Sequence, residues 1–498
     1  MSLLKKLAGE TAIYGTSSIL SRLLNYVILT PYFTRVFQPD EYGVVSDLYT
    51  WAALLMVLFT WRLETAFFRY GSEEGMLGKS FGTATAALFG ITAMLTFVLV
   101  VFAQPLANVL RYPQHPEYVV WFAFIMAFDA LAAIPFGRLR LENKPVRFAI
   151  FKTLNILINI VFVFFFLELC PLLAQAGYAG FENFYRPEDS ILYVFVSNCI
   201  ASLLIFFLLL PAYFRLRQAV DMALLKRMLV YAGPLVIVGI AGVINQLIGI
   251  PMIKELASDD MEYNKNMMGI FSAASKIAVL MSLFTQAFNY AAEPFFFRNA
   301  ARTDKKQLYA QVALAFTIAG SLVFLGVLLY LDIIQYFIGK DFRAGLGVVP
   351  LLLLAYLFLG LYYNFSIWYK LADRTAIGGY IATIGAIITL ALNYYLIPRW
   401  GYYGPGWAAL ACYFFMAMAS YLTGRKYYPI DYPVGKMSVY ILSCLIIYFL
   451  SLWLRPWLIG NMWLLFAVNS MLLLCFFLLV FWMERDKLAR FLPGKKAN

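Results

Sequence analysis

Long apolar segments separated by short polar ones run through the whole chain. Each apolar segment has about 20 residues or more, which is enough to cross the hydrocarbon core of a bilayer as a helix. The pattern predicts about fourteen transmembrane helices, over residues 11–34, 41–66, 81–107, 118–137, 146–169, 191–214, 229–252, 267–294, 308–331, 346–369, 376–397, 405–423, 436–454 and 460–483. The sequence therefore predicts an all-α polytopic membrane protein.

The composition excludes an ordinary soluble enzyme. Of the 498 residues, 63% are hydrophobic and 13% are charged, whereas soluble domains are about 45–50% apolar and about 25% charged. All predicted loops are short, and the longest outer one, residues 171–190, is too small to hold a catalytic or nucleic-acid-binding domain. One histidine and five scattered cysteines without a C-x-x-C pair indicate neither a metal site nor a disulfide framework. We expect no catalytic residues, no cofactor and no nucleic-acid partner.

The basic residues orient the predicted helices. With the N-terminus in the cytoplasm, 27 of the 39 lysines and arginines fall in cytoplasmic segments, nine in outer segments and three inside spans. Cytoplasmic loops of membrane proteins carry such an excess of positive charge. Both termini are therefore expected in the cytoplasm, and the net charge of +12 reflects membrane orientation and lipid headgroups.

An internal repeat divides the predicted helices into two halves. Three short motifs recur at nearly constant offset: Gly43-x-x-Ser46 as Gly269-x-x-Ser272, Glu64-x-x-Phe67-Phe68-Arg69 as Glu293-x-x-Phe296-Phe297-Arg298, and the segment 140–144 as 370–374. We expect a six-helix half over 1–217, a second over 218–427, and two further helices with a basic tail over 428–498. Six is an even number, so both halves have the same orientation, and such repeats place a substrate site at their interface. The alternative is a duplication that serves folding alone.

The segments that carry these motifs resemble polysaccharide-biosynthesis flippases. The residues concerned are Gln38-Pro39-Asp40-Glu41-Tyr42-Gly43, the stretch from Arg62 to Tyr70, and the stretch from Gly269 through Lys276 to Asn289, Glu293 and Pro294. The resemblance covers essentially the whole chain and indicates the oligosaccharide-lipid (O-unit) flippases of the multidrug/oligosaccharidyl-lipid/polysaccharide exporter (MOP) superfamily. It implies a V-shaped pair of helical bundles around a central cavity, in the inner membrane of a bacterial cell.

Charged residues inside the predicted spans are the candidates for the site. A charge near the middle of a bilayer costs about 2.5–3.5 kcal/mol on insertion scales, so it normally faces a cavity or a partner. Arg22, Asp47, Asp129 and Lys276 occupy such positions in the first, second, fourth and eighth spans. They are either structural ion pairs, such as Arg22 with Asp47 or Asp129, or the lining of a cationic cavity in which the carboxylates modulate charge or carry a proton.

Polar residues on the same helix faces extend this set. Asn25 lies three residues after Arg22, and at 100° per residue the polar residues of the eighth span fall within a roughly 140° arc. Arg62 and Glu64 lie close enough to the inner surface to snorkel there without a role in transport. The candidate substrate-binding residues are Arg22, Lys276, Arg62, Asn25, Gln286 and Asn289, and those for charge modulation or coupling are Asp47, Asp129, Glu64 and Glu293.

Together these features predict a flippase that moves polyprenyl-pyrophosphate-linked oligosaccharide from the inner to the outer leaflet by alternating access. Arg22 and Lys276 would attract the pyrophosphate, and Arg62 would assist at the inner mouth. A monomer is expected, with membrane lipids and polysaccharide assembly proteins as further partners. The alternatives on the same fold are a cation-coupled multidrug antiporter and a lipid II flippase. A membrane glycosyltransferase or O-unit polymerase would need a large outer catalytic loop.

Overall fold

The computed structural model describes residues 23–178, 180–181, 185–214, 220–299, 302–372, 374–458 and 460–488, and throughout these ranges it consists of helices, turns and short connections. The predicted all-α class is confirmed. The chain forms two compact units, Met1–Ser272 and Ala273–Asn498. The predicted division at residues 217 and 427 stays a prediction.

The first unit begins, within the described part, with a helix over residues 23–36. The elements that follow are α2 (Pro39–Thr60), α3 (Leu63–Gly71), α4 (Leu77–Val101), α5 (Ala103–Val109), α6 (Pro116–Leu141), α7 (Pro145–Phe164), the π-helical turn η1 (Phe165–Leu169), α8 (Cys170–Gln175), the 3₁₀ turn η2 (Pro187–Asp189), α10 (Ser190–Phe214), α11 (Met222–Leu247) and α12 (Gly249–Leu256). Helix α13 (Met261–Arg298) continues from the first unit into the second.

Helix α6 is the centre of the first unit. It packs against α2, α3, α4, α5, α7 and α10, while α11 packs on α2, α3 and α4. Two thirds of its apolar window is buried inside the protein, a much larger share than in its neighbours α4 and α7. A helix that is hydrophobic on all sides suits such a position.

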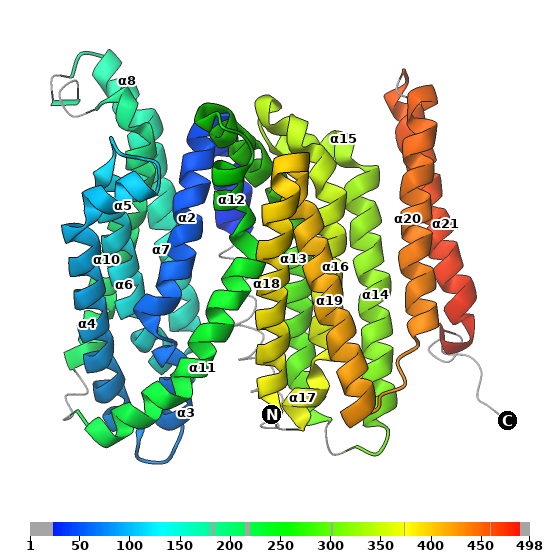
Figure 1. Cartoon of the computed structure of the whole chain (residues 1–498), viewed down its shortest axis with the longest axis horizontal. Coiled ribbons are helices and arrows are strands. Elements are labelled where there is room, and N and C mark those ends of the chain that lie inside the picture. The colour runs from blue at the N-terminus through cyan, green and yellow to red at the C-terminus, as the bar shows by residue number, and fades with distance from the viewer. Residues whose placement is uncertain are drawn as a thin grey trace. The chain divides into compact units, whose positions relative to one another are not determined.

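The second unit contains a bundle of long helices after α13. Its elements are α14 (Lys305–Leu329), α15 (Leu331–Ile334), the 3₁₀ turns η3 (Gln335–Phe337) and η4 (Lys340–Val348), α16 (Val349–Phe365), α17 (Ile367–Leu371), α18 (Thr375–Trp400), α19 (Tyr403–Tyr427), α20 (Val434–Leu458) and α21 (Met462–Leu488). Helix α19 packs against α16 and α18, and α20 and α21 lie side by side (Figure 1).

Glycines allow close helix contacts in this unit. A Cβ atom at Gly360 of α16 would lie 1.9 Å from the ring of Phe316 on α14, and one at Gly320 of α14 would lie 2.4 Å from Leu357 on α16. The hydrophobic effect does not drive helices together inside a membrane, so their association depends on close packing, which small residues allow.

Thirteen helices of the described residues are long and apolar enough to cross a membrane. They correspond to the predicted spans from 41–66 to 460–483, which are thereby confirmed as helices. Of the predicted first span, 11–34, residues from 23 onward are helical, and the rest lies outside the described residues. The total of fourteen and the V shape stay predictions.

The second predicted span differs from a continuous helix. Trp61 and Arg62 have φ values of 46° and 53°, and they separate α2 from α3. Two successive side-chain-bearing residues in the left-handed region cost of order 1–2 kcal/mol each. The break redirects the Arg62 side chain toward α11, where a Cβ atom at Gly239 would lie 2.6 Å from the guanidinium. The glycine therefore makes room for the arginine.

Candidate functional site

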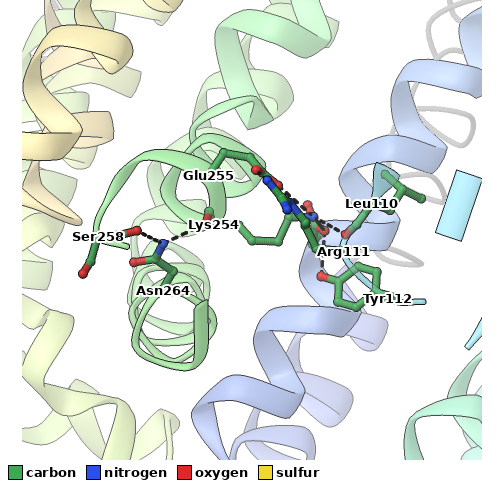
Figure 2. Close-up of polar contacts among 8 residues, drawn as sticks. Leu110, Arg111, Tyr112, Lys254, Glu255, Ser258 and Asn264 are labelled. Atoms are coloured by element: carbon green, nitrogen blue, oxygen red, sulfur yellow. Dashed lines mark hydrogen bonds and ion pairs between the residues drawn. The ribbon is translucent and has the colours of Figure 1, made fainter. Parts of the chain in front are cut away.

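A buried cluster of charges joins three segments of the first unit. Lys254 of α12 donates a hydrogen bond to Asp47 Oδ2 of α2, with Nζ and Oδ2 2.5 Å apart. The Tyr112 hydroxyl, from the turn between α5 and α6, donates to the same oxygen at 2.7 Å. Lys254 Nζ also donates to the Leu110 carbonyl at 2.9 Å (Figure 2). Asp47 is 0% exposed and Lys254 is 1% exposed, so this ion pair is removed from solvent.

The local sequence explains how each member is held. Pro39 at the first position of α2 and the Glu41 carboxylate, which accepts the N–H of Gln38 at 2.9 Å, fix the start of the helix two turns before Asp47. Arg111 has a φ of 65°, and this left-handed residue turns the chain between Leu110 and Tyr112 so that both face Lys254.

The turn from α12 into α13 is held by one amide. Asn264 Nδ2 donates to the carbonyl oxygens of Lys254 at 2.9 Å and Ser258 at 2.7 Å. Figure 2 shows the amide between these two carbonyls, on the side of α12 away from the Lys254 ammonium. Because a buried asparagine that bridges two backbone groups fixes both, it sets the position of Lys254.

The cluster consists of one buried ion pair, Lys254 with Asp47, and a second charged pair at its exposed edge. Burial, and then the Asp47 charge, raise the pKa of Tyr112 well above its ordinary value, so the hydroxyl remains a donor. Asp47 Oδ1 has no hydrogen-bond partner among the described residues. At the exposed edge, Arg111 Nε lies 3.5 Å from Glu255 Oε2, while Glu255 Oε1 lies 4.0 Å from Lys254 Nζ. The carboxylate of Glu255 is thus a second negative charge beside Lys254, and it interacts with the lysine more weakly than Asp47 does because it is further away.

Two glycines of the internal repeat pack against each other next to this cluster. A Cβ atom at Gly43 of α2 would lie 2.6 Å from the Lys265 carbonyl oxygen of α13, and one at Gly269 would lie 1.6 Å from the Pro39 carbonyl oxygen. Gly43 is one helical turn before Asp47. The matching motifs that indicated the repeat are therefore also in direct contact within the first unit.

The structure places three of the predicted cationic and amide residues, Lys276, Gln286 and Asn289, on α13 and the others that it describes elsewhere. Arg22 lies outside the described residues. Asn25 is exposed on the helix over residues 23–36, and Lys276 is half-buried on α13. Gln286 Nε2 donates to Ser282 Oγ at 3.1 Å, and Asn289 is half-buried three residues further along the chain. The polar stripe of α13 is thus present, and its role stays a prediction.

The remaining predicted residues each lie near a side chain that can pair with them. Arg62 and Glu64 face each other with 3.8 Å between the closest nitrogen and oxygen. Glu293 accepts a hydrogen bond from Lys370 of α17 at 2.8 Å, which joins two of the repeat motifs within the second half. Asp129 is half-buried on α6, near Ser202 of α10 and Lys152 of α7.

Sequence reasoning missed Lys254 and Tyr112. Lys254 lies two residues after the predicted seventh span, 229–252, and is one of the nine basic residues that the charge count places in outer segments. The available signal was Asp47, a carboxylate inside a span that requires a cationic partner. Its partner is 207 residues away in the chain, and hydropathy cannot pair residues at that distance.

The cluster is an arrangement for charge pairing between α2, α12 and the turn before α6. The described residues contain no group of three His, Cys, Asp or Glu side chains that could hold a metal ion. The fold is that of an all-helical membrane protein, with thirteen helices of the described residues long and apolar enough to cross a bilayer. The fold is similar to that of the lipid II flippase MurJ in an inward closed conformation, at 14% identity and a TM-score of 0.71, covering 95% of this chain and 99% of MurJ.

Two further solved structures share the fold. One is an inward-facing multidrug resistance MATE family transporter of the MOP superfamily, at 10% identity and a TM-score of 0.62, covering 86% of this chain and 95% of the transporter. The other is the Vibrio cholerae MATE transporter VcmN in its bent form, at 12% identity and a TM-score of 0.56, covering 89% and 98%. No curated protein sequence matches the chain.

The polysaccharide biosynthesis protein family matches residues 7–300, which is more than half of the chain. The protein belongs to this family. The resemblance to polysaccharide-biosynthesis proteins, predicted from the sequence, is confirmed by this match, and the fold shared with MurJ and the MATE transporters agrees with it.

Proposed function

We propose that the protein flips polyprenyl-pyrophosphate-linked oligosaccharide from the inner to the outer leaflet of the bacterial inner membrane, by alternating access, for surface polysaccharide biosynthesis. The family match over residues 7–300 carries the proposal. The long apolar helices and the short connections support it, because a substrate with a lipid tail needs a path through the membrane and no outer domain.

The proposed roles of the side chains follow from their charges and positions. Lys276, with Arg22, would attract the pyrophosphate, and Arg62 would do so at the inner mouth, where it lies beside Glu64. Asn25, Gln286 and Asn289 would bind sugar hydroxyls. We assign Asp47 to the ion pair with Lys254, and Glu293 to that with Lys370, so that both would act on conformation instead of touching substrate.

Lipid II is the second candidate substrate. The specific observation in its favour is the TM-score of 0.71 with the lipid II flippase MurJ over nearly the full length of both chains. Lipid II and lipid-linked oligosaccharide share a polyprenyl pyrophosphate, so the same cationic residues would serve both. A cation-coupled multidrug antiporter is the third, on the likeness to MATE transporters.

The test is flipping by the purified protein in proteoliposomes. Three substrates are compared in identical vesicles: a polyprenyl-pyrophosphate oligosaccharide detected by lectin on the far leaflet, lipid II, and a cationic dye with a sodium or proton gradient. We expect transport of the oligosaccharide lipid. Gradient-driven dye transport without lipid flipping would instead identify an antiporter, and flipping of lipid II alone would identify the second candidate.

A matched pair of variants tests the cationic site. Lys276→Ala should stop flipping, with protein abundance and melting temperature close to wild type, while Lys276→Arg should retain activity because it keeps the charge. If both variants lose folded protein, Lys276 serves stability instead of substrate binding.

The proposed orientation has its own test. A cysteine at Ser72, between α3 and α4, should resist an impermeant thiol reagent in intact cells, whereas one at Asp259, between α12 and α13, should react. Four of the five native cysteines are buried, and the fifth, Cys475, is exposed within the apolar helix α21, so the protein without an introduced cysteine is labelled in parallel to measure the background. Labelling of Ser72→Cys and protection of Asp259→Cys would reverse the proposed orientation.

A further inference from the structure

A pocket of about 520 Å³ lies beside the first turns of α14 in the second unit. The segment between α19 and α20 also lines it. Among its lining residues are Lys306, Gln307, Gln311 and Leu314 from α14, and Asp431 and Pro433 from the connecting segment. The apolar span of α14 begins at Lys305, so the pocket lies at the membrane surface.

The lining changes from polar to apolar along α14. Lys306 and Gln307 are in the first turn of α14, Gln311 lies about 7.5 Å further along the helix axis than Lys306, and Leu314 about 12 Å further, at 1.5 Å per residue. Lys306, Gln307 and Gln311 are exposed, and Leu314 is buried. This order fits an amphiphile with its polar end at the mouth and its chain along the helix.

The pocket lining carries one cationic and two anionic side chains, Lys306, Asp304 and Asp431. Lys306 and Asp431 have no ion pair among the described residues, and Lys306 Nζ lies 5.1 Å from the ring centroid of Tyr428. The third charged residue, Asp304, is occupied by Arg302, whose guanidinium donates to its two carboxylate oxygens at 2.7 and 2.8 Å.

The start of α14 contributes to the anion-binding side. Asp304 is its N-cap residue and makes no side-chain hydrogen bond to the first turn. The N–H groups of that turn therefore have no capping oxygen, and helix N-termini of this kind attract phosphate. Lys306 belongs to this first turn, and the Asp431 carboxylate lines the same pocket from the segment between α19 and α20.

We propose that this pocket binds the headgroup of a zwitterionic phospholipid of the phosphatidylethanolamine type. Its phosphate would lie at Lys306 and the first turn of α14, and its ammonium would donate to Asp431. The Gln311 amide would reach the glycerol esters, and an acyl chain would follow Leu314 and Pro433. The carboxylate at the mouth disfavours an anionic headgroup such as phosphatidylglycerol, and a choline headgroup has no N–H to donate.

The experiment measures phospholipid binding to the purified full-length protein by native mass spectrometry, with phosphatidylethanolamine, phosphatidylglycerol and phosphatidylcholine of identical chains. We expect wild type to prefer phosphatidylethanolamine. Asp431→Asn should weaken its binding about tenfold, as expected for one charge-assisted hydrogen bond, and bring it level with phosphatidylcholine. Lys306→Gln should weaken both lipids equally, since both carry the phosphate.

Lys305→Gln is the matched control, because Lys305 is adjacent on the same helix and does not line the pocket. It should leave all three affinities unchanged. Equal binding of the three lipids to wild type, or an Asp431→Asn variant that keeps the preference, would overturn the proposal. Binding of phospholipid is measured without any oligosaccharide lipid, so its failure would leave the proposed transport function untouched.

Discussion

Replacing Lys254 by methionine should strongly destabilise the first unit. The substitution keeps the side-chain volume but leaves the Asp47 carboxylate, which is 0% exposed, without its cation. Removing one partner of a buried ion pair costs about 3–5 kcal/mol. Tyr112 continues to donate one hydrogen bond to Asp47, and a hydrogen bond to a charged group contributes about 1.5–3 kcal/mol, so the lower end of the range, about 3 kcal/mol, is expected.

The assay is thermal unfolding in detergent, with Lys265→Met as control. Lys265 lies near the same cluster, with Nζ 5.3 Å from the Tyr112 ring centroid, but it is half-buried and makes no hydrogen bond to Asp47 that the described residues show. The control should lose about 1 kcal/mol or less.

A double variant decides between a lost ion pair and lost packing. Asp47→Asn combined with Lys254→Met leaves no buried charge, and the new amide can accept from Tyr112 and donate to the Leu110 carbonyl that Lys254 releases. It should recover most of the stability lost in Lys254→Met. If the double variant is as unstable as the sum of the single ones, the two residues are not coupled and the reasoning is wrong.

Two other perturbations have clear expected results. Gly269→Ala places a Cβ atom 1.6 Å from the Pro39 carbonyl oxygen, so α2 and α13 must separate at a cost of about 1–3 kcal/mol, and the melting temperature should fall. The control is Gly242→Ala on α11, which has nothing within 4 Å and should leave the melting temperature unchanged or raise it. An equal effect of both substitutions would contradict the close contact. The pKa of Asp221, at the start of α11, is lowered to about 2, chiefly by its hydrogen bond from Lys79. The stabilisation of the fold by the ionised Asp221 is therefore present above about pH 4 and is lost as the pH falls toward 2. The melting temperature of Asp221→Asn should depend less on pH over this range than that of wild type, and parallel curves would refute the role of the Asp221 carboxylate.

The helices could be predicted from the sequence because a membrane span is a local property. A run of about 20 apolar residues forms a helix whatever lies beside it, since each backbone polar group must be satisfied within the segment. For this reason thirteen predicted spans recur in the structure. The break at Trp61 and Arg62 could not be predicted, because neither residue is a glycine and the room for the arginine comes from Gly239, far along the chain.

The candidate site was predicted only in part. Asp47 was recognised, since a carboxylate in an apolar run is conspicuous in any sequence. Its partner was not, because Lys254 lies at the end of a span, where the orientation rule already accounts for a lysine. Glu293 was likewise recognised without its partner Lys370. In both cases the charge inside a span is visible locally, while the choice of partner is made by the packing of helices.

The glycine contact and the ion pair at the start of α2 support each other physically. Gly43 lies one turn before Asp47, and its contact with α13 brings the two backbones too close for water to enter between them. In a site without water, the attraction between Lys254 and Asp47 is stronger than it would be at a surface, and the ion pair in turn fixes α12 against α2. Small residues and buried charges are thus needed at the same place. The contact between Gly43 and Gly269, two matching positions of the repeat, therefore has a structural role beyond duplication. It packs α2 and α13 together beside Asp47, the only charge that α2 buries completely among the described residues.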